Sequence, residues 1–95
     1  MSNSDTITVS CGEVLDIARV GEFYTELTMI LNEEKPIEID ASQLERIDIS
    51  GLQVLLAFYQ KVKSSGFDIN WSNPSESMLR SAKLVGLQEQ LGLSE

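Results

Sequence analysis

The spacing of apolar residues changes several times along the chain, and each spacing predicts a different element. Residues 6–10, TITVS, alternate apolar and polar and are rich in β-branched side chains, which is the pattern of a strand. Residues 14–15 fit a further, very short strand. In residues 17–31 the apolar positions recur three or four apart, which predicts an amphipathic helix of about four turns. Residues 37–40 alternate again and predict another strand.

The second half of the chain repeats this succession. Residues 43–49, QLERIDI, are interpreted as a connection with two apolar anchors, Leu44 and Ile47. A strongly apolar helix is predicted over residues 50–64, because apolar residues recur there at helical spacing. Residues 67–71, FDINW, alternate and predict a strand.

The stretch NPSES is typical of a helix start. Asn73 fits the N-cap, Pro74 fits the first helical position, and Glu76 stands where a capping box has its acid. The helix is expected to continue to Val85 and to end at Gly86.

The order of these elements defines the fold class. Strands that alternate with helices need crossover connections, which produce a mostly parallel sheet with right-handed crossovers. We therefore expect one α/β domain over residues 1–95. Its small mixed sheet has about four strands, and with so few short strands the helices are expected to gather mainly on one face.

Charge and composition restrict the classes of partner. Fifteen acidic residues against seven basic ones give a formal charge of −8, so the phosphates of nucleic acids and of anionic membranes would be repelled. A basic protein partner is compatible with this charge, and so is the plain interpretation that the charge keeps a small domain soluble. No apolar run reaches the roughly 18 residues of a membrane span. The start of the chain has neither the basic nor the apolar region of an export signal.

The residue types also restrict chemistry. Histidine is absent, which excludes the Ser-His-Asp and Cys-His nucleophile systems and the common zinc sites. Cys11 is the one cysteine, so the chain forms no internal disulfide, which suits the reducing cytoplasm. Neither GxGxxG nor GxxxxGK[ST] occurs, and we expect no cofactor and no metal.

The stretch RIDISGLQVLLAF places an acid, a hydroxyl and a glycine where the connection meets the long helix. Ser50 fits the N-cap, and Asp48 is the alternative cap at the positive helix start. Gly51 permits a close approach of the backbone to a neighbour or to a ligand. The residues by themselves fit either a capped turn or a site reached from outside.

The apolar side of this helix is wider than sheet packing requires. At about 100° per residue its apolar side chains span an arc of about 200°, against the ~100° needed to cover a sheet. Either flanking helices cover the excess or it forms part of a face that binds a partner.

Three stretches resemble the STAS domain family, the fold of anti-sigma-factor antagonists. IDASQLERIDISGLQVLLAF is similar to the family's signature, in which a strand ending in Asp leads through an anchored loop into D-x-S-G and an apolar helix. GEVLDIARVGEFYTEL resembles the entry to the family's first helix. SSGFDINWSNPSESMLRSAKLVGLQEQLGL resembles its last strand, polar turn and final helix, so the likeness covers residues 6–93.

The resemblance implies a non-enzymatic switch that binds another protein. In the phospho-regulated members, the serine or threonine directly after the Asp is phosphorylated, and the partner is then released. Here Ile49 occupies that position and Ser50 follows it, so Ser50 is the candidate for phosphorylation. The implied partner-binding residues are those of the joint and of the exposed edge of the helix after it: Asp48, Ile49, Ser50, Gly51, Leu52 and Gln53.

The resemblance also implies the kind of partner. The short Gram-negative proteins of this type suggest a cytoplasmic module that binds a serine-kinase-like anti-sigma factor or a chemotaxis component. The alternative is an accessory subunit of an ABC-type lipid transport complex, bound to its ATPase. A homodimer is compatible with both. A small enzyme is disfavoured, because no general base of suitable pKa accompanies Asp48 and Ser50.

Overall fold

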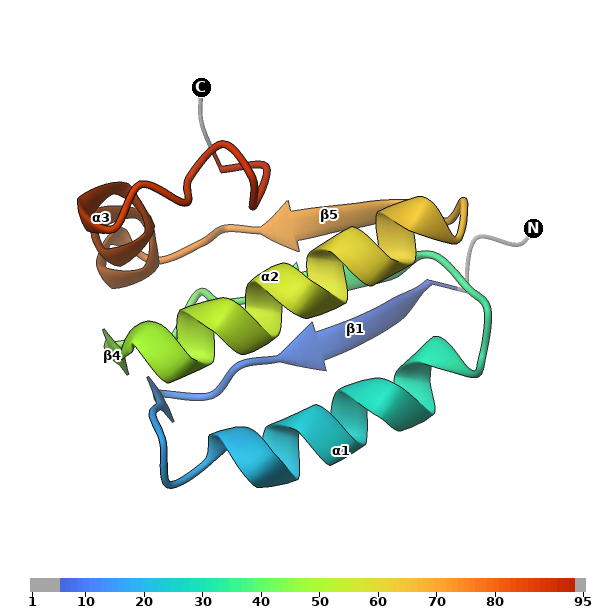
Figure 1. Ribbon diagram of the computed structural model, residues 1–95, viewed down its shortest axis with the longest axis horizontal. Helices are drawn as coiled ribbons and strands as arrows, with labels where there is room; N and C mark the ends of the chain where they lie inside the picture. The colour runs from blue at the N-terminus through green and yellow to red at the C-terminus, as the bar shows by residue number, and fades with distance from the viewer. Residues whose placement is uncertain (1–5, 94–95) are drawn as a thin grey trace.

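The computed structural model describes residues 6–93, and the ends of the chain, including part of the stretch considered for an export signal, lie outside them. The elements in chain order are β1 (Ile7–Ser10), β2 (Val14–Leu15), α1 (Val20–Leu31), β3 (Ile37–Asp40), β4 (Arg46–Ile47), α2 (Ile49–Ser64), β5 (Ile69–Ser72) and α3 (Glu76–Leu84). Figure 1 shows α1 and α2 side by side in front of the strands, with α3 at the end toward which the strands point. The expected α/β class, with a small parallel sheet and helices mainly on one face, is confirmed.

The main sheet has three parallel strands in the order β1-β3-β5. Its alternation is the one that the sequence predicts, because Val9, Ile39 and Ile69 are buried while Thr8 and Asn70 are exposed. The buried rows face α1 and α2, and the polar rows form the opposite face.

A second, two-stranded sheet pairs β2 with β4 in parallel. The sequence predicted β2 but treated residues 46–47 as connection, so β4 is an addition. Val14 and Leu15 are both apolar, whereas Arg46 and Ile47 pair a charged residue with an apolar one, as a loop also can, and the pairing of Leu15 with Ile47 exists only in the folded chain. This small sheet holds the start of α2 in place.

One cluster of buried side chains fills the space between the helices and the sheet. Its members include Phe23 and Leu27 of α1, Leu52 and Leu55 of α2, and Ile39 of β3. Most of the wide apolar arc of α2 is covered by the chain itself, since Val54, Leu56 and Tyr59 are half-buried against this cluster. The flanking elements thus account for most of the excess apolar arc and leave part of it open to solvent.

The start of α3 differs from its prediction. Ser75, not Asn73, is the N-cap, and its hydroxyl accepts from the Met78 N–H at 3.1 Å and donates to the Leu44 carbonyl at 2.6 Å. Asn73 instead adopts a positive φ of 47° in the turn before the helix. Ser75 is favoured as the N-cap because its hydroxyl also binds the carbonyl of Leu44, in the loop before β4. This contact joins residues far apart in the chain, so the local sequence does not reveal it. The predicted end is close, with Val85 as C-cap and Gly86 in the left-handed region at φ 76°.

Candidate functional site

The joint between β4 and α2 is organised by both oxygens of one carboxylate. Asp48 is the N-cap of α2, and its Oδ1 accepts from the Gly51 N–H at 3.1 Å. Its Oδ2 accepts from the Ile17 N–H at 3.0 Å, in the loop between β2 and α1. Of the two caps that the sequence allowed, Asp48 is the one used, and Ser50 lies inside the first turn. Asp48 therefore fixes the start of α2 and ties it to a segment 31 residues away.

Gly51 sits where the helix passes closest to β2. A Cβ at this position would lie 2.5 Å from the Leu15 carbonyl oxygen and 2.9 Å from Cγ1 of Ile47. That carbonyl accepts from the Asp48 N–H at 3.3 Å, so it is held in position. The close approach that Gly51 permits is thus to the protein's own backbone.

The exposed surface at this joint is apolar at its centre. Ile49 is 49% exposed and Ile17 is 70% exposed, and the hydrogen bond from Ile17 to Asp48 keeps both beside the start of α2. Gln53 is exposed and Ser50 is half-buried. We call Ile17, Asp48, Ile49, Ser50 and Gln53 the docking patch.

Two of the residues expected at the partner face are internal. Leu52 was predicted on the exposed edge of the helix, but its side chain is only 2% exposed and belongs to the core, so that prediction is wrong. Gly51 is buried as well. In the structure α2 is oriented so that Leu52 lies in the core and Ile49 points to solvent. A helical wheel does not determine this orientation, because it does not show which face of the helix packs on the sheet.

Ile17 is the surface residue that sequence reasoning missed. It lies three positions before Val20, and this spacing continued the apolar stripe of the predicted helix. The helix instead begins at Val20, and Ile17 lies in the loop before it. One feature of the sequence could have indicated a loop here, because Ile17 follows an acid. In the structure Oδ1 of Asp16 accepts from the Ala18 N–H at 3.1 Å, which holds a turn.

A reactive thiol could come only from Cys11, and a metal cluster would draw on Cys11 and the acidic side chains. Cys11 is fully buried, and burial first, then the charge of Asp40, raises the pKa of its thiol to about 12, which keeps it neutral at physiological pH. Within residues 6–93, no three acidic or sulfur side chains come together as a metal site. None of the helices described there has both the length and the apolar character for crossing a bilayer.

The double role of Asp48 predicts a graded loss of stability. Asp48→Ala should lower the free energy of unfolding by about 1.5 kcal/mol, because it removes the cap and leaves two N–H groups without this acceptor. Asp48→Asn should cost about half as much, because an amide oxygen can still cap the helix while its NH₂ cannot accept from Ile17. Urea unfolding followed by circular dichroism measures both. Equal stability of the alanine variant and the wild type would contradict this role.

The comparison with known protein families agrees with the fold. A family model described as "Mlab, STAS domain" matches residues 2–94, and the chain therefore belongs to this STAS family. A search of curated proteins finds no match. At the level of the family, STAS domains are interaction modules that bind other proteins and are generally not catalytic.

Proposed function

We propose that this chain is a cytoplasmic docking module of a bacterial signalling pathway, whose protein partner binds the docking patch. The observation that carries the proposal is the exposure of two isoleucines at the D-x-S-G signature: Ile17, whose N–H binds Asp48, and Ile49, which follows Asp48 in the chain. Apolar side chains exposed at one rigid joint are typical of the centre of a protein interface.

The geometry of the joint suits tight docking. Asp48 holds the loop and the helix start together through two hydrogen bonds, so little conformational freedom remains to be lost on binding. Complete burial of each exposed isoleucine would contribute on the order of 1 kcal/mol. The negative charge of the chain favours a partner with basic side chains around an apolar centre.

Phosphorylation of Ser50 would provide the switch. Ser50 is the second residue of α2, between the exposed Ile49 and the buried Gly51. A phosphate there adds about −1.5 to −2 charges in the middle of an apolar contact, and the cost of burying it would release the partner. The helix start favours such an anion, whereas the carboxylate of Asp48 opposes it.

The second candidate function is a permanent accessory subunit of an ABC-type lipid transport complex. Ile49 favours it, because this residue has no hydroxyl at the usual acceptor position and instead supplies apolar surface. Permanent interfaces are more apolar than transient ones and need no switch. In that case the same patch would bind the transport ATPase, and Ser50 would not be modified.

Affinity capture of the tagged chain from its own cells, with mass spectrometry of the retained proteins, separates the two candidates. A kinase-like ATPase or a chemotaxis component, together with a phosphorylated peptide containing Ser50, would support the signalling module. An ABC ATPase with its permease would replace it by the accessory subunit. If the capture retained only further copies of this chain and no other protein, both candidate functions would be contradicted.

Calorimetry with the captured partner then tests the patch itself. Ile49→Glu and Ser50→Asp should each raise the dissociation constant about tenfold or more, because each substitution buries a charge in the contact. The control is Asn70→Glu, which places the same charge on the exposed polar face of the sheet and should leave the affinity unchanged. Unchanged affinity in both patch variants would contradict the placement of the partner.

A further inference from the structure

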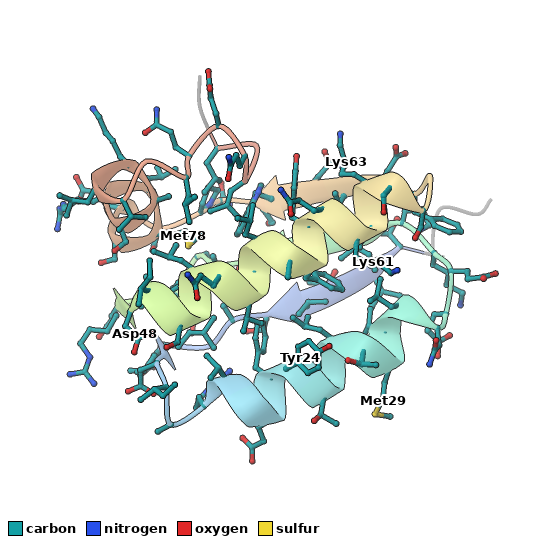
Figure 2. The ribbon with its side chains drawn as sticks, in the orientation of Figure 1. Tyr24, Met29, Asp48, Lys61, Lys63 and Met78 are labelled. Carbon is teal, nitrogen blue, oxygen red and sulfur yellow. The ribbon has the colours of Figure 1, made fainter. Side chains whose placement is uncertain are left out.

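A groove runs between α1 and α2, away from the docking patch. Its volume is about 560 Å³, and its lining includes Tyr24, Leu27 and Leu31 of α1 and Val54, Phe58 and Lys61 of α2. Figure 2 labels Tyr24 on the α1 side and Lys61 on the α2 side. The docking patch lies at the first turn of α2, whereas this α1–α2 groove follows its middle and later turns. Two partners could therefore be bound at the same time.

The lining residues repeat along the helix axes. On α1 they stand at i, i+3 and i+7, and on α2 at i, i+4 and i+7. Each set covers two turns, or roughly 10 Å of helix. A channel of this length between two parallel helices has the shape that accepts the apolar face of a third helix, whose anchors stand at the same spacing.

The lining of the groove combines apolar side chains with one positive charge and with the uncharged polar residues Thr28, Asn32 and Ser65. Leu27 and Phe58 are almost fully buried and form its floor, while Tyr24 is 59% exposed beside it. None of the acidic residues within 6–93 lines the groove, and among these described residues Lys61 is the one charged member of the lining. A carboxylate on the bound segment could approach Lys61 without meeting a negative charge of the groove itself.

We infer that the α1–α2 groove docks an amphipathic helix of a partner protein. This helix carries apolar side chains at i, i+3 or i+4, and i+7, and an acidic residue that pairs with Lys61. The apolar anchors supply the affinity, and the ion pair sets the direction in which the helix lies.

Selection from a displayed library of helix-forming peptides, randomised on one face, tests this inference with the whole chain as the target. The expected peptides share the apolar spacing and an Asp or Glu near one end. Ala57→Arg should abolish their binding in fluorescence anisotropy, because Ala57 is an exposed residue of the lining and the larger side chain would fill the groove. Gln60→Arg is the matched control on the same helix, since its side chain is exposed outside this groove and should not change binding.

Charge exchange tests the ion pair separately. Lys61→Glu should lower the affinity for the selected acidic peptides about threefold, which is the effect expected from loss of an exposed ion pair. It should raise the affinity for versions of these peptides in which lysine replaces the acid. Ile49→Glu should have no effect, which keeps the groove distinct from the docking patch. If Ile49→Glu and Ser50→Asp left the affinity of the captured partner unchanged, the docking patch would be wrong, but peptide binding in the groove would still stand.

Four outcomes would overturn the inference. The first is that the library yields no peptide whose binding is lost in Ala57→Arg. The second is that Ile49→Glu also loses peptide binding. The third is a wild-type dimer that Ala57→Arg converts to monomers, which would assign the groove to a second copy of the chain. The last is binding of a fluorescent fatty acid, but of no peptide, that Ala57→Arg abolishes.

Discussion

Glutamate in place of Leu52 is expected to unfold the protein, whereas glutamate in place of Ile49 should leave it folded. The two positions lie in the same first turn of α2 and receive the same charge, but Leu52 is 2% exposed and Ile49 is 49% exposed. At Leu52 the change removes roughly 1.5–3 kcal/mol of apolar burial. It also buries a carboxylate without a partner, which costs several kcal/mol more. The sum is comparable to the ~5–15 kcal/mol that stabilises a typical domain.

At Ile49 the same substitution has small and opposing effects. Some apolar contact is lost, while an acid in the first turn interacts favourably with the helix start by about 0.3–1 kcal/mol. Far-UV circular dichroism and urea unfolding measure both variants. A cooperatively folded Leu52→Glu protein would contradict the burial of this side chain, and an unfolded Ile49→Glu protein would contradict its assignment to the docking patch.

Alanine in place of Gly51 is expected to destabilise the protein by about 2–3 kcal/mol, although alanine is the better helix former. The added methyl group would lie 2.5 Å from the Leu15 carbonyl oxygen and 3.0 Å from Cγ of the same residue. The carbonyl belongs to β2, which is paired with β4, and it already accepts from Asp48. Relief of the contact therefore requires α2 to move away from the small sheet, which also disturbs the docking patch.

Gly21→Ala is the matched control, because Gly21 lies in α1 and an added Cβ there would meet no atom within 4 Å apart from those of the adjoining helix. It should stabilise the protein by about 0.5 kcal/mol through the reduced entropy of the unfolded chain. Denaturant unfolding of the two variants gives the comparison directly. Two stabilised variants would show that the approach of α2 to the Leu15 carbonyl does not require glycine at position 51, and two destabilised ones would assign the effect to the loss of glycine in general.

Much of the fold could be predicted from local pattern. The alternation in residues 6–10 and 37–40 indicated β1 and β3, and the spacing of apolar residues indicated α1 and α2. These patterns are informative because a strand and a helix each bury one face, and the period of that face is written into the order of side chains. The strand β4 was missed because Arg46 and Ile47, unlike the apolar pair of β2, cannot be told from a loop by their residue types.

The candidate site was found from the sequence, but its division into core and surface was not. The segment from Asp48 to Gln53 was singled out for its acid, hydroxyl and glycine at the start of an apolar helix. The wide apolar arc of α2 hid the fact that Leu52 points to the core while Ile49 points outward. Ile17 was invisible as a neighbour, because its hydrogen bond to Asp48 joins segments far apart in the chain.

By itself, the sequence determined the α/β class, the absence of histidine chemistry and the resemblance to STAS domains, because composition, periodicity and a local signature are properties of the order of residues. Only the tertiary structure decided that Asp48 caps α2 and binds the Ile17 loop, that Gly51 allows the close approach of the Leu15 carbonyl, and that α1 and α2 together line a groove. The reason is physical. Whether a side chain is a cap, a core residue or an exposed contact depends on which distant segment packs beside it, and that choice is made by the packing of the whole chain.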